Sequence, residues 1–379
     1  MDTTAPQSSP AAATASVEPA PTPLTAALRH GGDVAGAAHH GVVTASQFAG
    51  AAAELDALLH RAGVFDRGGQ AFLRCSGRDR VRWLNGMVTN SVKTLEDGQG
   101  CYAFVLNAQG RIQGDVNIYR LASEPEALLL VTSVPQVETL TAWWRRYIIM
   151  DQVTIEPMPQ WTALGVAGPQ AAERLAALEL PVPSQPDTLL ETEWHGAHVV
   201  VVAAHSPLVP QFQLWVAVEH VATLWRALAG VVEPCGSLAV DRLRILSGVP
   251  EVGADIGGRD LPEETNQMRA IHFSKGCYLG QEIVERIRSR GAVHRTLSGF
   301  CLQQALPIPA AILSADKPVG EITSVASVEL PGRPQQWIGL GYLRREALEA
   351  GAPLLADGAP VRVVPLPFPL EPDICAPQG

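Results

Sequence analysis

The sequence predicts an α+β protein that ends in a small all-β unit, and three observations support this prediction. The chain has 379 residues, which is more than one small core accommodates, so two or three subdomains are expected. Helical and strand-like patterns alternate between residues 51 and 246. After Leu297 they give way to short apolar alternations separated by turns containing Pro and Gly, a pattern typical of a barrel or sandwich.

The expected elements follow from these patterns. Apolar residues at helical spacing predict helices over residues 51–61, 78–88, 133–148, 169–178, 221–229 and 238–246. Alternating or continuous apolar runs predict strands over 72–77, 101–106, 111–121, 127–132, 153–155, 161–166, 197–203, 212–218, 297–302, 319–325, 337–342 and 361–364. Ser133 is expected to cap its helix. The strand–strand–helix order that recurs between residues 100 and 230 suggests one α+β region of split βαβ type.

One predicted hairpin carries a candidate acid. Its strands flank the turn-rich tetrapeptide Asn107-Ala-Gln-Gly110. Along the second strand, Asp115 shares a polar face with Arg111, Gln113, Asn117 and Tyr119. That face is either exposed to solvent or the wall of a ligand pocket with Asp115 as its acid, and periodicity does not separate the two.

Composition and cysteine spacing favour a cytoplasmic protein. The net charge of −10 argues against broad binding to nucleic acids or membrane surfaces. The six cysteines (75, 101, 235, 277, 301 and 375) form no CxxC pair or dense cluster. Neither a disulfide framework nor a conventional zinc or iron–sulfur ligand set is therefore expected, as is typical of a reducing compartment. Residues 1–24 contain no basic residue and few large apolar ones, and they are expected to be a disordered tail.

The stretch Lys275-Gly-Cys-Tyr-Leu-Gly-Gln-Glu282 is a candidate site for a reactive thiol. Cys277 lies two residues after a lysine and just before a helical pattern, and both a cation and a helix start favour the thiolate. The two glycines, Gly276 and Gly280, permit a positive φ or a close approach of the backbone. Glu282 and Arg286 are spaced as an i,i+4 ion pair. In the alternative interpretation, Cys277 is a small buried residue in a turn.

Two further charged stretches have weaker interpretations. Residues 253–264 contain four acids in a Gly/Pro-rich loop, where scattered carboxylates are expected to be solvated. Residues 286–295 form a local basic cluster that suits either a polyanionic partner or a solvated surface.

The cysteine stretch, together with Arg286 and Gly291, resembles the signature of the YgfZ family of folate-binding proteins. These are bacterial relatives of the mitochondrial iron–sulfur assembly factor, and they are related to the T-protein (aminomethyltransferase) of glycine cleavage. Further segments resemble the family in the same order, so that the likeness extends from about residue 25 to 368: residues 83–90, 107–115, 146–149, 243–248, 320–324 and 339–342.

The resemblance implies a three-subdomain, aminomethyltransferase-like fold around a central hole that holds tetrahydrofolate. Residues 25–290 would form the folate-binding part, residues 291–368 a C-terminal β-barrel, and residues 369–379 a tail. Asp115 would contact the folate, and Arg244 falls on an arginine of the related transferases. The transferases carry a Gly-Glu turn that recognises the pterin, but the comparable residues 205–211 contain no carboxylate, which weighs against aminomethyl transfer.

The leading hypothesis is a cytoplasmic, tetrahydrofolate-dependent factor that assists assembly or repair of iron–sulfur clusters in client proteins, tRNA-modifying enzymes among them. Cys277 would be the working thiol with Lys275 as its helper, and Arg286 would stabilise the thiolate or the folate tail. The loop around the thiol would be shaped by Tyr278, Gln281 and Glu282. One alternative is a folate-dependent one-carbon transferase, either an aminomethyltransferase or a demethylase. Another is a cysteine hydrolase that pairs Cys277 with His272 or His294. No direct contact with nucleic acid or a membrane is expected, and no metal ligand set.

Overall fold

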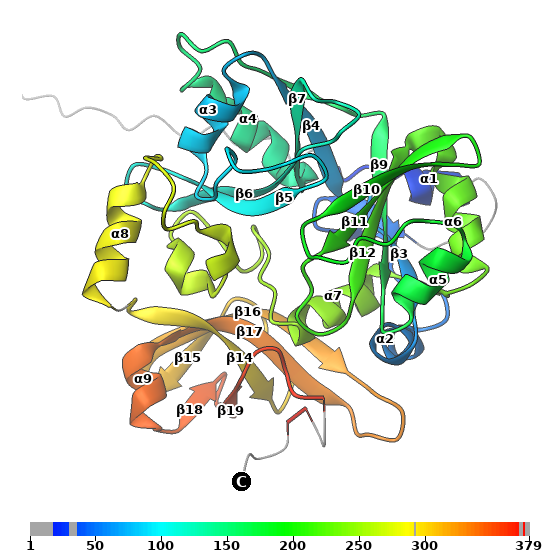
Figure 1. Ribbon diagram of the computed structural model, residues 1–379. Coiled ribbons are helices and arrows are strands. Elements are labelled where there is room, and N and C mark those ends of the chain that lie inside the picture. The colour runs from blue at the N-terminus through cyan, green and yellow to red at the C-terminus, as the bar shows by residue number, and fades with distance from the viewer. Residues whose placement is uncertain (1–17, 30–35, 292, 371–373, 376–379) are drawn as a thin grey trace, which may run out of the picture.

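The computed structural model describes residues 18–29, 36–291, 293–370 and 374–375. Its main units are two large β-sheets and a closed barrel (Figure 1). The three units meet around the loops that follow helix α7 (Ser237–Leu246). The predicted fold class is confirmed. No helix within the described ranges is both long and apolar enough to cross a bilayer.

The first sheet has five antiparallel strands. Their order is β5 (Gly100–Leu106), β6 (Ile112–Tyr119), β7 (Ala127–Ser133), β4 (Gln70–Ser76) and β8 (Thr154–Pro157). Helices α3 (Arg80–Met87) and α4 (Val137–Arg145) pack on it through a core that includes Leu84, Leu130 and Trp144. The predicted hairpin is therefore present as β5–β6.

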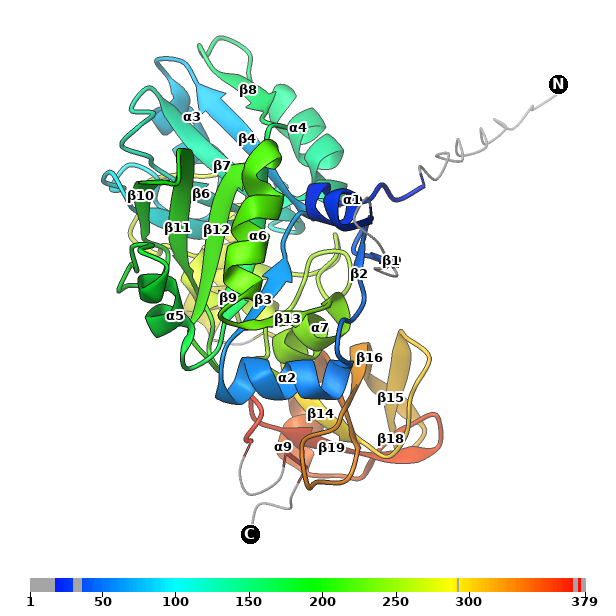
Figure 2. The same ribbon diagram turned by 90° about the vertical axis from the view of Figure 1, so that its right-hand side faces the viewer.

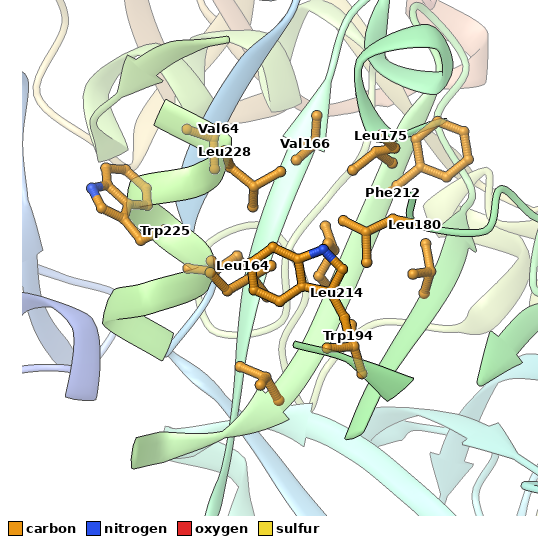
Figure 3. Packing of buried hydrophobic residues seen from close by; sticks show 14 of the residues in the cluster. Val64, Leu164, Val166, Leu175, Leu180, Trp194, Phe212, Leu214, Trp225 and Leu228 are labelled. Carbon is orange, nitrogen blue, oxygen red and sulfur yellow. The ribbon is translucent and has the colours of Figure 1, made fainter. Parts of the chain in front are cut away.

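The second sheet has six strands. Their order is β10 (Leu189–Trp194), β11 (Ala197–Ala204), β12 (Gln211–Ala217), β9 (Trp161–Ala167), β3 (Gly63–Asp66) and β13 (Glu233–Cys235). Helices α1 (Pro23–Arg29), α5 (Ala171–Ala177) and α6 (Val221–Ala229) cover one face, and Figure 3 shows part of the core beneath them, with Leu164, Leu214 and Trp225. Aromatic residues join its other face to the first sheet, since the ring of Trp215 lies 4.9 Å from that of Tyr119.

The barrel closes in the order β14 (Arg295–Leu302), β17 (Gln336–Arg344), β16 (Lys317–Val328), β15 (Ala310–Ser314), β18 (Leu354–Ala356) and β19 (Ala359–Val364). Helix α9 (Arg345–Ala350) interrupts a region that was expected to be all-β. Helix α7 and helix α2 (Ala51–His60) lie between the second sheet and the barrel (Figure 2).

The remaining elements connect these units. A two-stranded hairpin is formed by β1 (Gly36–His39) and β2 (Val42–Ala45), and α8 (Gln281–Arg290) lies between the first sheet and the barrel (Figure 1). Short 3-10 turns occur at Val134–Gln136, Val218–His220, Pro262–Thr265 and Met268–Ala270. The cap predicted at Ser133 is absent, because the Ser133 hydroxyl instead accepts a hydrogen bond from Gln136 Nε2 at 2.9 Å.

The order of strands corrects one prediction. Residues 100–230 do not form a single split βαβ unit. The hairpin β5–β6 pairs with β7 in the first sheet, whereas β9–β12 join β3 and β13 in the second. Strands β3 and β13 are only four and three residues long, too short for a periodic signal to reveal them.

Both predicted tails are shorter than expected where the structure describes them. Residues 1–17 of the predicted N-terminal tail lie outside the described residues, but Thr22 and Leu24 are buried in the fold. At the other end, residues 371–373 and 376–379 lie outside the described residues, while Ile374 packs against the barrel core.

A disulfide joins Cys375 to Cys301 across 74 residues, so the expectation of no disulfide is wrong. Because the two cysteines lie 74 residues apart, no local sequence pattern predicted that they would pair.

The acids of residues 253–264 are also not solvated as expected. Asp255, Asp260 and Glu264 are 3%, 1% and 6% exposed. Arg244 pairs with Asp255, and Arg295 pairs with Asp260 and Glu264. These ion pairs fix the loop between α7 and the barrel.

Candidate functional site

A cavity of about 300 Å³ opens where the two sheets, the β1–β2 hairpin and α7 meet. Polar side chains contribute much of its wall: Thr22, His39, His40, Thr44, Asp66, Arg67, Gln70, Tyr102, Asp115, Asn117, Tyr119, Thr132, Ser133, Gln136, Asp187, His205, Ser206, Gln211, Gln213, Ser237, Asp241, Arg244, Ser247, Glu251, Gln267 and Arg269. None of the described barrel residues lines it. This size and mixture suit a small organic ligand with several polar groups.

Asp115 projects from β6 into the cavity wall. Its carboxylate accepts hydrogen bonds of 2.7 Å from both Tyr102 Oη and Gln136 Nε2. The Gln136 side chain also accepts a bond of 2.9 Å from the Asp115 backbone N–H, so one amide fixes both parts of the aspartate. Burial raises the pKa of Asp115 above its ordinary value, although the bonds from Gln136 and Tyr102 oppose this. The result is an oriented acid in a poorly solvated wall.

The alternation along β6 explains how the wall forms. Asp115, Asn117 and Tyr119 lie on one face of the strand, and all three line the cavity. The sequence left open whether this face is exposed to solvent or forms the wall of a ligand pocket. Asp115, Asn117 and Tyr119 belong to the wall of a pocket. Arg111 and Gln113, which share the same periodicity, lie outside the lining residues.

Next to Asp115, the wall is completed by residues that no sequence pattern singled out. The Arg269 guanidinium stacks 4.1 Å from the centre of the Tyr102 ring, and its Nη1 is 3.9 Å from Asp187 Oδ2. Burial lowers the pKa of His205 to about 4, and Arg269 acts in the same direction, so His205 is neutral at pH 7. Tyr102 could have been suspected as a polar ring on the strand paired with β6. Arg269 lies in the 3-10 turn Met268–Ala270 and His205 in an irregular segment, and neither has a periodic pattern around it.

At the α7 end of the cavity, Arg244 is fully engaged by its own protein. It donates to Asp241 at 2.8 Å and to Asp255 at 2.5 Å. It also reaches Ser324 of the barrel at 3.0 Å. Arg244, a predicted folate contact, lines the cavity, but these partners give it a structural role.

Glu251 and the β1–β2 hairpin complete that end. Burial raises the pKa of Glu251 to about 7, against the opposing effect of Arg244. His40 Nδ1 lies 3.0 Å from Glu251 Oε1 and links the hairpin to the loop after α7. Burial and the adjacent His40 lower the pKa of His39 to about 4.

Cys277 lies outside this cavity. Its side chain is exposed, whereas the other three free cysteines (75, 101 and 235) are buried. The alternative of a small buried cysteine is therefore wrong. No hydrogen bond joins Cys277 to His272 or His294 among the described contacts, and His272 Nδ1 instead accepts from the Ser274 backbone N–H at 3.2 Å.

The Lys275 ammonium group forms hydrogen bonds that were not expected of a residue that assists Cys277. Its Nζ donates to the backbone carbonyls of Asn85 at 2.6 Å, of Val88 at 2.7 Å and of Asn90 at 2.5 Å. Three bonds use every N–H of an ammonium group. The lysine therefore anchors the cysteine loop to the last turn of α3 and to the segment that follows it.

The hairpin that carries Asp115 also supports the cysteine loop. Gly280, at the start of α8, has a φ of 84°, and a Cβ there would lie 2.5 Å from the Asn107 carbonyl oxygen in the β5–β6 turn. Only glycine fits such a position. Gly276 needs neither a positive φ nor close packing. Asp115 and Cys277 are thus connected through one hairpin without sharing a pocket.

The other four predicted site residues lie around α8. None of Tyr278, Gln281, Glu282 and Arg286 lines the cavity. Tyr278 is 8% exposed, and its backbone N–H donates to Gln281 Oε1 at 3.2 Å. Glu282 and Arg286 are exposed, and the predicted ion pair between them does not form. Glu285 and Arg288 pair instead, at 3.5 Å.

No group of three or more His, Cys, Asp or Glu side chains within the described ranges is placed to hold a metal ion.

Two family models match the chain. The GCVT N-terminal domain covers residues 30–275, and the CAF17 C-terminal beta-barrel domain covers residues 290–368. The residues between the two models, 276–289, comprise the loop that carries Cys277 and most of α8.

Individual proteins agree with these models. An aminomethyltransferase of Rubrobacter xylanophilus is 31% identical over 337 residues, which span 85% of this chain and 87% of the relative. The tRNA-modifying protein YgfZ of Yersinia pestis is 29% identical over 259 residues, which span 66% and 74%. The crystal structure of glycine cleavage system aminomethyltransferase T from Bartonella henselae matches with a TM-score of 0.81 at 21% identity, covering 93% of this chain and 98% of that one, which shows a common fold. The chain therefore belongs to the YgfZ family, which is related to the aminomethyltransferases of glycine cleavage.

Proposed function

We propose that the protein binds tetrahydrofolate or one of its derivatives in the cavity, with Asp115 as the principal contact. The observation that carries this proposal is the buried Asp115 carboxylate, oriented by Tyr102 and Gln136 on the wall of a 300 Å³ cavity. A buried acid suits a ligand that presents N–H groups, as a reduced pterin does, because a charge-assisted hydrogen bond is strong in a poorly solvated site.

The rest of the wall fits a heterocycle whose edge alternates donors and acceptors. Asn117, Gln211 and Gln213 line the cavity, and an amide both donates and accepts. Neutral His205 also offers one donor and one acceptor. These groups are suitable substitutes for the carboxylate that residues 205–211 lack.

We further propose that Cys277 is the working thiol of a factor that assists iron–sulfur clusters in client enzymes of the cytoplasm. The exposed thiol can meet a protein partner, whereas its position outside the cavity lining keeps it from a bound folate. The printed name of the Yersinia relative, a tRNA-modifying protein, supports tRNA-modifying enzymes as the client class. In this proposal the chain contacts the client enzyme and not the RNA itself.

Calorimetry tests the folate part. Titration of tetrahydrofolate into the wild-type protein should give saturable binding, and Asp115→Ala should weaken it at least ~10-fold, as expected when a charge-assisted hydrogen bond is lost. Asp97→Ala, which changes an exposed aspartate, is the matched control. Equal affinity in all three proteins would remove Asp115 from the site.

Complementation tests the thiol part. In a strain that lacks this gene, wild-type protein should restore the activity of iron–sulfur tRNA-modifying enzymes, and Cys277→Ala should not. Ser274→Ala, an exposed change in the same loop, should behave as the wild type. Full restoration of that enzyme activity by Cys277→Ala would contradict the hypothesis that Cys277 is the working thiol.

The likeness to the Rubrobacter aminomethyltransferase, which extends over 85% of this chain, supports a second candidate, a folate-dependent one-carbon transferase. Turnover of a methylamine donor in the presence of tetrahydrofolate, with no effect of Cys277→Ala, would favour it over the first.

A further inference from the structure

Arg67 lies in the turn between β3 and β4, where the chain passes from the second sheet to the first, and it lines the cavity. Its Nε is buried and has no hydrogen-bond partner. The adjacent Asp66 does not serve as its counter-ion. That carboxylate instead accepts from the hydroxyls of Thr22, Thr25 and Thr44 and from the Gly68 N–H.

The other acids near Arg67 are also engaged elsewhere. Glu251 lies 3.0 Å from His40 and 3.6 Å from Arg244, and Asp241 accepts from Arg244 at 2.8 Å. Within the described ranges Arg67 forms no ion pair, in contrast to Arg244, which has three carboxylates around it. A guanidinium stays charged even where burial lowers its pKa, as it does here. A charge in such a place needs a counter-ion.

Two further lining residues carry a buried polar atom that lacks a hydrogen bond, although Arg269, unlike Arg67, has an ion partner in Asp187. Gln70 Oε1 and Arg269 Nη1 are buried without a hydrogen-bond partner. Buried polar atoms in folded proteins are nearly always paired, so unpaired atoms that face one cavity indicate groups supplied by a ligand. Among these atoms the Arg67 guanidinium is the cation without an ion partner in the described part of the chain, and it favours an anionic ligand.

Arg67 and Asp115 line the same cavity from different elements. Arg67 lies in the turn before β4, and Asp115 projects from β6, so one ligand in the cavity can contact both side chains.

We propose that Arg67 is the counter-ion for a carboxylate of a ligand whose polar heterocycle lies against Asp115. The assignment of that ligand as a folate, with its pterin at Asp115 and its glutamate carboxylates at Arg67, rests on the proposed function. The anion site itself rests only on the unpaired guanidinium in the cavity.

Calorimetry with three probes on wild type, Arg67→Met and the exposed control Arg78→Met tests this. The probes are 5-formyltetrahydrofolate, 6-methyltetrahydropterin, which lacks the carboxylates, and N-(4-aminobenzoyl)-L-glutamate, which lacks the pterin. Arg67→Met should weaken binding of the two carboxylate probes about 10- to 100-fold, the usual range for a charge-assisted hydrogen bond. Its affinity for the pterin should stay within about twofold of wild type, and Arg78→Met should change nothing.

The outcomes separate this inference from the proposed function. If wild type binds the aminobenzoylglutamate through Arg67 but binds no pterin, the anion site stands and the folate proposal fails. If wild type binds the pterin and Arg67→Met leaves all affinities unchanged, the folate proposal stands and the anion site is overturned. If wild type binds none of the probes, both are overturned.

A second measurement distinguishes a ligand contact from a structural arginine. Without ligand, Arg67→Met removes an unpaired buried charge, so its midpoint of thermal unfolding should equal or exceed that of wild type. A clear fall in the midpoint would mean that Arg67 holds the fold together, and it would overturn the assignment.

Discussion

Replacement of Lys275 by methionine tests whether this lysine anchors the cysteine loop or activates Cys277. The variant keeps the apolar stem but removes three hydrogen bonds to the carbonyls of Asn85, Val88 and Asn90. At roughly 1 kcal/mol for each carbonyl left without its donor, the expected loss is about 3 kcal/mol. Part of this is offset because the ammonium no longer has to be buried, so a net loss of about 2 kcal/mol is a fair expectation.

The loss should be concentrated in the cysteine loop, and hydrogen exchange measures it there. The Leu279 amide donates to the Gly86 carbonyl at 3.0 Å, and the His272 amide donates to the Thr89 carbonyl at 3.1 Å. Both amides should exchange about 30-fold faster in Lys275→Met, which is the factor that about 2 kcal/mol of local stability represents. Lys93→Met, an exposed change near the same segment, is the control. Unchanged protection together with slower alkylation of Cys277 would refute the anchoring role and restore the activating one.

Three more predictions follow from the site. Arg244→Met should lower the free energy of unfolding by about 3 kcal/mol, because it leaves the buried Asp255 carboxylate without its cation; an unchanged urea midpoint would contradict this. Iodoacetamide should label the native protein at Cys277 alone, and this labelling should disappear in Cys277→Ser, since burial raises the pKa of Cys75 and Cys101 to about 12. Rapid labelling of a second cysteine, detected by mass spectrometry, would contradict the described burial. The pKa of Glu251 is raised from 4.5 to about 7, so between these pH values the folded protein retains a proton that the unfolded chain releases. The contribution of Glu251 to the free energy of unfolding therefore falls as the pH rises from 4.5 to about 7. Relative to wild type, Glu251→Gln should therefore gain stability between pH 5 and pH 7.5 in urea unfolding, and a constant difference would refute the shift.

The regular elements could be predicted from sequence because their signals are local. The β5–β6 hairpin combines alternating residues with the turn Asn107–Gly110, and both are visible in a short window. The assignment of strands to sheets was wrong because pairing is not local: β9 hydrogen-bonds to β3, almost a hundred residues earlier. The disulfide between Cys301 and Cys375 was missed for the same reason.

The candidate site was predicted only in part. Periodicity placed Asp115 on a polar face, and the resemblance suggested a folate contact there. Its partner Gln136 follows the next strand, and Arg269 comes from a loop more than 150 residues away, so neither has a local pattern. The anchoring contacts of Lys275 could not be predicted because its acceptors are backbone carbonyls, and residue identities carry no information about these.

A crystal structure of the protein with 5-formyltetrahydrofolate tests the central claim most directly. The account predicts electron density in the cavity between the two sheets, with the pterin against the Asp115 carboxylate and a glutamate carboxylate against the Arg67 guanidinium. Density with the pterin at Arg67, or a ligand bound outside this cavity, would contradict it.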